Sequence, residues 1–317
     1  MRRRTALTIT AAGLVVVATL ALPGAAVAAR APIAIVPQRV GPEQTVLVGS
    51  AWRVKVVVRR YVAGQRVVVG LFRHGRRLRA LAVPIVPGPR GTGVATAAVG
   101  GRSAGPVLVR AAHFPTAQLG ALVSKPVRVH VRAARAALGA RGPVVTMLQR
   151  SLRALGYVTG PRGSFEHRTG RAVLAFRKVV GMDRTEVADA SVFRALARGK
   201  GRFRVRYPRH GRHVEADLSR QVLALVEGAR VARILPTSSG KPSTPTVLGQ
   251  YRVYSKTAGT NAKGMLDSSY FIRGYAIHGY PSVPIFAASH GCLRIPNGEA
   301  AYVFGWLRIG DRVDVYR

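Results

Sequence analysis

Cysteine is almost absent from this chain, which has 317 residues and a single thiol, Cys292. A lone cysteine has no partner for an internal disulfide, so it is free, bound to another molecule or reactive. Acidic residues are also scarce: 12 Asp and Glu stand against 50 Lys and Arg, and the formal net charge is +38. Such a charge attracts polyanions. The basic residues are scattered and no nucleic-acid-binding motif accompanies them, so the sequence predicts no nucleic-acid partner.

After the first 30 residues the chain has no long apolar run. The apolar run within the first 30 residues resembles a targeting segment. Arginines at positions 2–4 precede an uncharged stretch from Ala6 to about Leu22, and Ala26-Val27-Ala28 forms a small-residue cleavage pattern. This predicts a secretory signal peptide over residues 1–29. An uncleaved N-terminal anchor is the alternative, because the stretch approaches the ~18 apolar residues of a membrane span. Either way, we expect an exported protein on the outer side of the cytoplasmic membrane.

Outside that membrane, the counter-charges that this basic chain meets are anionic wall polymers and membrane surfaces. A compositional bias towards Arg, Ala, Val and Gly explains the charge equally well without any electrostatic role. The remaining length suggests two or three domains.

Residues 30–132 have the pattern of an all-β domain. Short, partly alternating runs such as SAWRVKVVVRRYV and GPVLVRAAHF are broken by Gly and Pro at regular intervals. This spacing predicts an antiparallel sandwich. The region contains no titratable cluster or metal-ligand spacing, so we expect a spacer or interaction role. It resembles the immunoglobulin-like domains often placed ahead of cell-wall enzymes.

Residues 136–200 change to a helical period. Val145, Leu148, Leu152 and Leu155 recur at three- and four-residue steps after Pro143, which suits a first helical turn. A second helix is predicted over 169–181, and a third follows Asp189, a plausible N-cap. We expect a compact three-helix unit with a modest core of its own.

This helical region resembles a short peptidoglycan-binding repeat. The residues that carry the resemblance are Leu148-Gln149, Leu152, Leu155-Gly156-Tyr157, Gly163, Phe165, Thr169, Ala172-Val173 and Phe176. Most of them are core and turn positions. A three-helix domain that has lost its wall-binding groove is therefore the alternative to wall binding.

Residues 212–317 return to strand patterns, with hairpin turns at Ser219-Arg220 and Glu227-Gly228. One amphipathic helix is predicted from Asn297, as its cap, to Gly310. We therefore expect a mainly β domain with one short helix at the C-terminal end of the chain.

The stretch IHGYPSVPIFAASHGCLRIPN contains the residues that suggest chemistry. A thiol attacks acyl carbon as a thiolate, and a nearby imidazole lowers the thiol's pKa by stabilising the charged pair. His278 and Cys292 flank a proline-containing loop that can fold back and bring them together. Gly291 lets the backbone bend so that amides near Cys292 face a developing oxyanion.

Two other interpretations of these residues remain open. A lone cysteine is most often a small buried hydrophobic residue. Alternatively, His278, His290 and Cys292 could supply three ligands to a catalytic zinc ion. Against zinc, two of the three are only two residues apart in sequence and no supporting acidic residues are evident.

The same stretch resembles the signature of the L,D-transpeptidase family, in which His-Gly is followed by Ser/Thr-His-Gly-Cys. Here these positions are His278-Gly279 and Ser289-His290-Gly291-Cys292. Upstream, Asp217-Leu218-Ser219, Ser239-Gly240-Lys241 and Thr244-Pro245-Thr246 resemble the family's opening. Two departures concern substrate contacts: ten residues separate His278 from Ser289, fewer than in many members, and Arg294 replaces an asparagine.

The resemblance implies a reaction and a role for each residue, with no cofactor and no metal. Cys292 attacks a peptidoglycan tetrapeptide stem, releases D-alanine and forms a thioester, and a neighbouring stem's amine completes a 3→3 cross-link. His278 is the base, and a carbonyl near Gly279 is the expected acceptor for its other ring nitrogen. The remaining predicted site residues are Ser289, His290 and Gly291 around the oxyanion, and Arg294 and Tyr280 on the substrate.

The partners implied are peptidoglycan stem peptides and glycan. Two alternatives stay open. Water could resolve the thioester, which would make the protein an L,D-carboxypeptidase, or the C-terminal domain could be the scaffold of a non-catalytic wall-binding protein.

Overall fold

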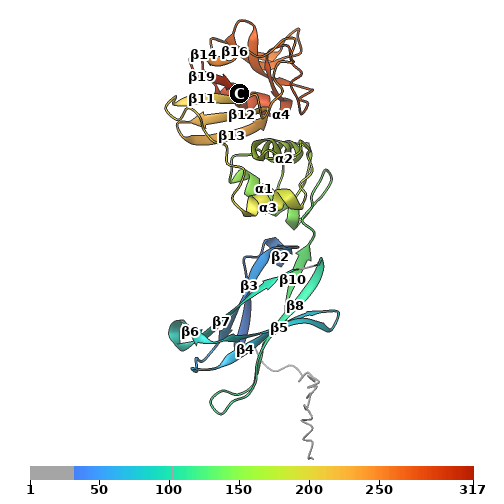
Figure 1. Ribbon diagram of the computed structural model, residues 1–317, viewed down its shortest axis with the longest axis vertical. Coiled ribbons are helices and arrows are strands. Elements are labelled where there is room, and N and C mark those ends of the chain that lie inside the picture. Colours follow the sequence, from blue (N-terminus) through green and yellow to red (C-terminus); the bar gives the residue numbers. More distant parts are fainter. Residues whose placement is uncertain (1–31, 102) are drawn as a thin grey trace, which may run out of the picture.

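The computed structural model describes residues 32–101 and 103–317. Figure 1 shows an elongated, mainly β molecule in which an N-terminal β region, three helices and a C-terminal β region follow one another along the long axis. The predicted signal peptide, residues 1–29, lies outside the described residues. Within the described ranges, no helix has the length and apolar character needed to cross a membrane.

The N-terminal region consists of two sheets around one apolar core. The first has the order β1 (Ile33–Gln38), β3 (Ala51–Val58), β7 (Gly93–Gly100), β6 (Val86–Pro87). The second has the order β2 (Thr45–Leu47), β10 (Val127–Arg132), β8 (Gly105–His113), β4 (Arg66–Arg73), β5 (Arg76–Pro84), with β9 (Leu122–Val123) beside β8. Two short 3-10 helices, η1 (Pro42–Gln44) and η2 (Pro89–Gly91), lie in its loops.

Alternation explains how these strands form a core. In β3 every second side chain from Trp52 to Val58 is buried, because successive residues of a strand face opposite sides of the sheet. The inward-facing side chains of both sheets make one apolar cluster. The region is β-rich, as the sequence predicts, and its likeness to immunoglobulin-like domains stays a prediction.

Three helices follow: α1 (Pro143–Arg153), α2 (His167–Val180) and α3 (Ala190–Ala197). Pro143 occupies the first turn of α1, as predicted. Helix α2 starts two residues before the predicted Thr169 and ends at Val180, and the next residue, Gly181, is a left-handed C-cap with φ 79°. Asp189 caps α3, because its carboxylate accepts hydrogen bonds from the backbone N–H groups of Ser191 and Val192.

The helices pack around an apolar core, as predicted, but this core is shared with the C-terminal sheet and is not independent of it. Their apolar cluster, with Leu148 and Phe176, also contains Val222, Ala224 and Ile234 from the C-terminal sheet. Strand β12 is buried on both faces, so its outer face needs a cover that the C-terminal region does not supply. Figure 1 shows α2 lying directly against β13 at this place.

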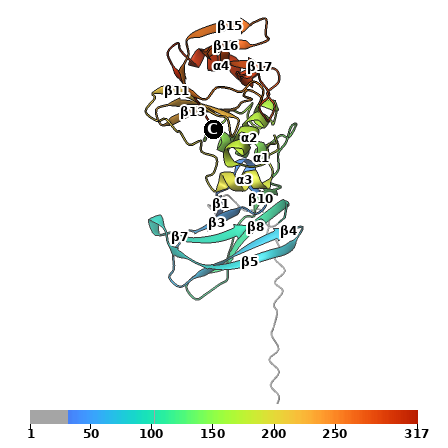
Figure 2. The ribbon, with the colours of Figure 1, turned by 45° about the horizontal axis from the view of Figure 1, so that its top comes forward.

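The C-terminal region has two sheets and one helix. The first sheet has the order β13 (Arg230–Pro236), β12 (Val222–Glu227), β11 (Arg212–Asp217), β19 (Arg312–Tyr316), β14 (Gly249–Arg252). The second has the order β15 (Ser255–Thr260), β16 (Leu266–Ile272), β17 (Tyr275–Tyr280), β18 (Leu293–Pro296). Figure 2 shows the second sheet on the side of the first that faces away from the helices.

Helix α4 (Asn297–Trp306) covers the second sheet and contacts β16, β17 and β18. Its start differs from the prediction by one residue, because Pro296 rather than Asn297 is the N-cap, and it ends at Trp306 rather than at Gly310. It packs closely on β17: a Cβ added at Gly279 would lie 2.7 Å from the Cβ of Ala300. Glycine at position 279 therefore allows the helix to approach this strand.

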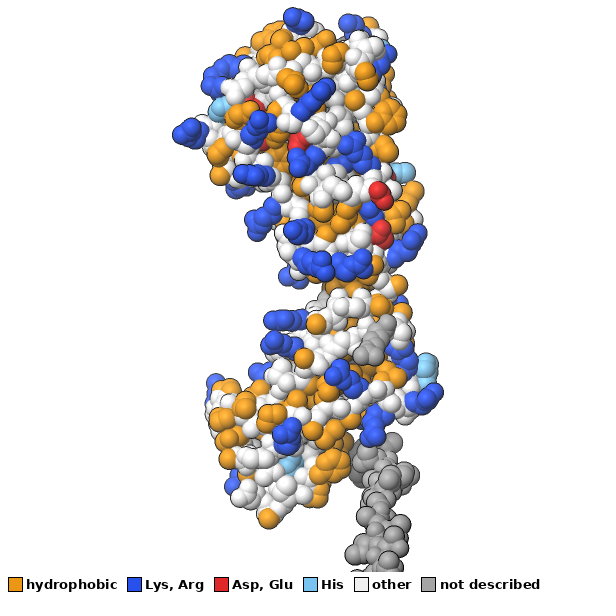
Figure 3. Space-filling model, viewed as in Figure 1, with side chains coloured by type: hydrophobic (Ala, Val, Ile, Leu, Met, Phe, Trp, Pro, Cys, Tyr) orange, Lys and Arg blue, Asp and Glu red, His pale blue; other side chains and the backbone are white. Residues whose placement is uncertain are grey.

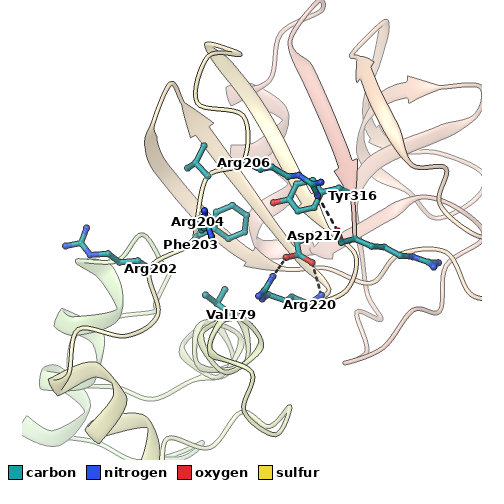
Figure 4. A pocket seen from close by; sticks show the side chains of 10 residues that line it. Val179, Arg202, Phe203, Arg204, Arg206, Asp217, Arg220 and Tyr316 are labelled. Atoms are coloured by element: carbon teal, nitrogen blue, oxygen red, sulfur yellow. Dashed lines mark hydrogen bonds and ion pairs between the residues drawn. The ribbon is translucent and has the colours of Figure 1, made fainter.

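The basic connector that leads from α3 into β11 is fastened to the first sheet. The backbone N–H groups of Arg206 and Tyr207 donate to the buried carboxylate of Glu215, at 2.7–2.9 Å, and the Tyr316 hydroxyl donates to the same group at 2.8 Å. Figure 4 shows Arg206 beside Tyr316, with the guanidinium 4.7 Å from the ring centroid.

Candidate active site

The parallel pairing of β17 with β18 brings the predicted catalytic residues to one cavity. Ile277 is paired with Leu293 and His278 with Arg294. Ile277 and Leu293 are buried in the core between the sheets, so the alternation of strand side chains puts His278 and Arg294 on the opposite face. Cys292 directly precedes Leu293 and faces the same way as Arg294.

That face forms a cavity of about 520 Å³. All the predicted site residues line it except Gly279 and Gly291, which contribute backbone geometry close by; the lining residues are Lys263, Met265, Gly274, Tyr275, His278, Tyr280, Ser289, His290, Cys292 and Arg294. The loop between His278 and Cys292 therefore folds back and brings imidazole and thiol to one cavity, as the sequence predicts.

His278 is held in one orientation by its own backbone. Its side chain is 2% exposed, and its Nδ1 lies 2.9 Å from the carbonyl oxygen of Gly279. A carbonyl can only accept, so Nδ1 carries the proton and Nε2 keeps a free lone pair. The ring of Tyr280 packs edge-on at 5.7 Å. This is the acceptor that the sequence analysis expected near Gly279, and it leaves Nε2 able to act as a base.

Burial acts against a charge on Cys292 and on His278, which is opposite to the expectation that the imidazole lowers the pKa of the thiol. Desolvation raises the pKa of the Cys292 thiol, although the Ala276 N–H and the charges of Arg294 and Lys263 oppose this shift. Desolvation also lowers the pKa of His278, and the charge of Arg294 lowers it further. Both directions disfavour an imidazolium–thiolate pair. These directions favour a thiol and a neutral imidazole, which line the same cavity.

Ser289 shapes the turn that carries the cysteine. Its hydroxyl donates to the carbonyl of Cys292 at 2.6 Å and accepts from the N–H of Gly291 at 3.1 Å. Because the Gly291 N–H is already bonded, this amide is not free to stabilise an oxyanion. Gly291 instead provides the bend: its φ is 115°, and an added Cβ would lie 2.5 Å from the ring of Tyr275.

Three further predicted residues, Arg294, Tyr280 and His290, line the cavity. Arg294 places its guanidinium 4.1 Å from the centroid of the Tyr280 ring, an arrangement that orients the planar cation. His290 is exposed at the edge of the cavity. The roles predicted for Arg294, Tyr280 and His290 towards substrate or oxyanion stay predictions.

A second segment, residues 237–246, forms hydrogen bonds with the turn that precedes Cys292. Thr246 donates its hydroxyl to the carbonyl of Gly291 at 2.8 Å, and Thr244 donates to the carbonyl of Ser289 at 3.2 Å. The carbonyl of Ser239 accepts from the N–H of Ser289 at 2.9 Å. The sequence analysis included these residues in the family resemblance but assigned them no role, because hydroxyl contacts between distant segments leave no periodic signal.

Three further residues that were not predicted from the sequence, Lys263, Met265 and Tyr275, also line the cavity. Lys263 and Met265 belong to the turn between β15 and β16, where both backbone N–H groups donate to the side chain of Asn261. The Asn-Ala-Lys-Gly sequence of that turn is the signal that predicts it. Lys263 adds a second cation to the cavity beside Arg294.

Within the described part of the chain, no three or more His, Cys, Asp or Glu residues are grouped so that they could hold a metal ion. His278, His290 and Cys292 line one cavity, but they do not form the zinc-ligand cluster considered from the sequence.

Comparisons with known proteins agree with this geometry. Residues 211–315 match the model of the YkuD family, described as the L,D-transpeptidase catalytic domain. The crystal structure of an L,D-transpeptidase from Xylanimonas cellulosilytica is 35% identical, covers 57% of this chain and 97% of that chain, and superposes with a TM-score of 0.54. L,D-transpeptidase 1 of Mycobacterium tuberculosis is 29% identical over 121 residues, which cover 32% of this chain.

The alignment spans about half the length of these curated mycobacterial relatives, 48%. The similarity to the Xylanimonas structure includes nearly all of that chain. Together with the family match over the two C-terminal sheets, this shows that the chain belongs to the L,D-transpeptidase family.

Proposed function

We propose that this protein is an exported peptidoglycan L,D-transpeptidase that uses Cys292 as its acyl-carrying nucleophile. Family membership supports a transpeptidase acting on peptidoglycan. The observation that carries the finer assignment is that Cys292 and His278 line one cavity, with His278 Nδ1 bonded to Gly279 and Nε2 left as a base.

Acylation starts from the neutral pair. The sulfur of Cys292 attacks the carbonyl between the third residue of a tetrapeptide stem and its terminal D-alanine, while Nε2 of His278 takes the thiol proton. The protonated imidazole returns this proton to the nitrogen of the departing D-alanine. The products of this step are a thioester on Cys292, free D-alanine and an imidazole that is neutral again.

Deacylation repeats these proton transfers with a second nucleophile. The side-chain amine of a neighbouring stem's diamino acid attacks the thioester, and His278 accepts a proton from the amine and passes it to the departing sulfur. An amide forms between the third residues of two stems, which is a 3→3 cross-link. With water as the nucleophile the same steps give an L,D-carboxypeptidase.

The cations of the cavity suit a carboxylate-bearing stem. Arg294 is oriented by Tyr280, and Lys263 lies on the neighbouring turn. A guanidinium can bind a carboxylate with two parallel hydrogen bonds. We assign Arg294 to a stem carboxylate, with Lys263 as a second positive charge that attracts it.

Measuring the intact mass of the protein after incubation with a tetrapeptide stem tests the nucleophile. The expected result is one adduct with the mass of the tripeptide acyl group, mapped to Cys292 and absent in Cys292→Ser, whose hydroxyl is far harder to deprotonate. A non-catalytic wall-binding protein would show no adduct.

We also propose that the chain associates with anionic polymers of the wall. Figure 3 shows Lys and Arg side chains over the whole visible face, with few acidic ones. A cavity of about 670 Å³ lies between α1 and the loop that follows β1. Its lining includes Arg39, Arg150, Arg153 and Arg162 and no Asp or Glu. An arginine-lined hollow without a competing carboxylate favours oxyanions such as phosphate.

A further inference from the structure

Two arginines of the helical region hold the loop that separates His278 from Cys292. Nη1 of Arg171, on α2, donates to the carbonyl of Val283 at 2.8 Å. Nη1 of Arg184, just after α2, donates to the carbonyl of Ile285 at 2.7 Å. Both carbonyls belong to residues 281–288, which join β17 to the turn of the cysteine.

This loop depends on such contacts because no regular structure holds it. Residues 281–288 lie outside every strand and helix. The Ser238 hydroxyl also donates to the carbonyl of Phe286 at 2.7 Å, and the N–H of Ala288 donates to the carbonyl of Ser239 at 2.9 Å. Three carbonyls of the loop, those of Val283, Ile285 and Phe286, therefore accept hydrogen bonds from side chains of other parts of the chain.

A buried lysine on the same helix holds the second segment behind Cys292. The side chain of Lys178 is 3% exposed, and its Nζ donates to the carbonyls of Gln221 and Thr237 at 3.0 and 3.2 Å. The side-chain amide of Gln221 exchanges two hydrogen bonds with Ser239, at 2.7 and 2.9 Å.

Further hydrogen bonds connect Ser239 to the turn of Cys292. The carbonyl of Ser239 accepts from the N–H of Ser289, whose hydroxyl closes the turn on the carbonyl of Cys292. The Thr237 hydroxyl donates to the carbonyl of Arg294 at 2.8 Å, on the other side of the cysteine. Helix α2 and Arg184, which follows it, are thus connected to both sides of the Cys292 turn, and none of Arg171, Lys178 and Arg184 lines the cavity of Cys292.

We propose that Arg171, Lys178 and Arg184 are positioning residues of the active centre, so that α2 is a structural part of the transpeptidase site. The proposal rests on the proposed function of Cys292. Its physical basis is that a displacement of about 1 Å between reacting groups can cost about 100-fold in rate. Loss of the two loop contacts should therefore slow acylation without removing any group that binds the stem.

The test compares the double variant Arg171→Gln/Arg184→Gln with a control of equal charge, Arg194→Gln/Arg198→Gln, whose arginines lie exposed at the end of α3. Hydrogen–deuterium exchange of peptides covering residues 281–292 reports on the loop whether or not the stem reacts. Steady-state turnover of a tetrapeptide stem with an acceptor stem present gives kcat and KM, and stopped flow gives the rate of the acylation step.

In the double variant we expect exchange at 281–292 at least about 10-fold faster and kcat reduced about 10- to 100-fold, with KM nearly unchanged and the control like wild type. Lys178→Met, which keeps the apolar stem and removes the donors, should shift kcat in the same direction. Unchanged exchange, or faster exchange with unchanged kcat, would overturn the proposal. If wild type forms no adduct while exchange responds as expected, the proposed function fails and the structural support by α2 stands.

Discussion

At the scale of single residues, burial decides how Cys292 reacts. The thiol lies in a partly closed cavity and its pKa is raised, while that of His278 is lowered. A histidine and a cysteine close together in sequence suggest an ion pair. The sequence does not show that both side chains are buried and lose contact with water. Desolvation opposes both charges. In the proposed mechanism, proton transfer therefore accompanies attack on the substrate rather than preceding it.

This account predicts the pH dependence of Cys292 acylation. Because the pKa of His278 is depressed, its imidazole remains an unprotonated base below its ordinary pKa of about 6.5. The wild-type acylation rate should therefore stay level from about pH 8 to about pH 6.5 and fall only in more acidic buffer. In His278→Ala the thiolate must form unaided, and its raised pKa lies above about 8.5. At neutral pH that variant should lose about 10²- to 10⁴-fold and recover as the pH rises.

Stopped-flow rates over this range check the prediction. A wild-type rate that climbs steadily through alkaline pH, parallel to His278→Ala, would mean that the imidazole is not the base.

At the scale of elements, we expect the segment 237–246 to affect stability and acylation as strongly as the turn that it supports. The hydroxyl of Thr246 donates to the carbonyl of Gly291 and accepts from the N–H of Gly240, both at 2.8 Å. Thr246→Val keeps the shape and leaves both groups unpaired in a buried place, which costs about 1–3 kcal/mol each. We expect a lower Tm and slower acylation. Thr260→Val, on the exposed strand β15, is the control and should change neither.

Sequence patterns predicted these elements unevenly. The strands, α1 and the cap of α3 follow from local periodicity and from residues such as Asp189 and Gly181. His278 and Cys292 could be identified because Cys292 is the single cysteine and both residues belong to short motifs, His278-Gly279 and Ser289-His290-Gly291-Cys292. The contact between Arg171 and Val283 joins residues 112 positions apart. No local signal records such pairs, which is why the support from α2 and the shared core escaped the sequence analysis.

At the scale of the whole molecule, the shared core predicts the outcome of truncation. A chain starting near Lys200 lacks the helices, and Val222, Ala224 and Ile234, each at most 1% exposed now, would face water. Exposing each larger apolar side chain costs about 1.5–3 kcal/mol. We expect this truncated chain to aggregate in size-exclusion chromatography. A chain starting near residue 136, which keeps the helices, should remain monodisperse and form the Cys292 adduct.

The charge of the whole molecule should affect encounter with the wall rather than the chemistry. Exposed cations attract anionic polymers, and salt screens them over a Debye length of about 10 Å at 0.1 M. Sedimentation with purified wall should therefore weaken as ionic strength rises, while alkylation of Cys292 by a small neutral reagent stays constant. If pelleting is independent of salt, the net charge of +38 is not what holds the protein on the wall.

The most direct measurement of the central claim is a chase of the isolated acyl-enzyme. Protein acylated by a tetrapeptide stem is freed of excess stem and mixed with a second stem that carries a free diamino-acid amine, and the products are weighed by mass spectrometry. The account predicts loss of the Cys292 adduct at a rate that depends on the acceptor stem, and a product with the mass of a 3→3 cross-linked dimer. Release of the tripeptide alone, at a rate independent of the acceptor, would contradict transpeptidation, and an adduct that survives in Cys292→Ser would contradict the cysteine nucleophile itself.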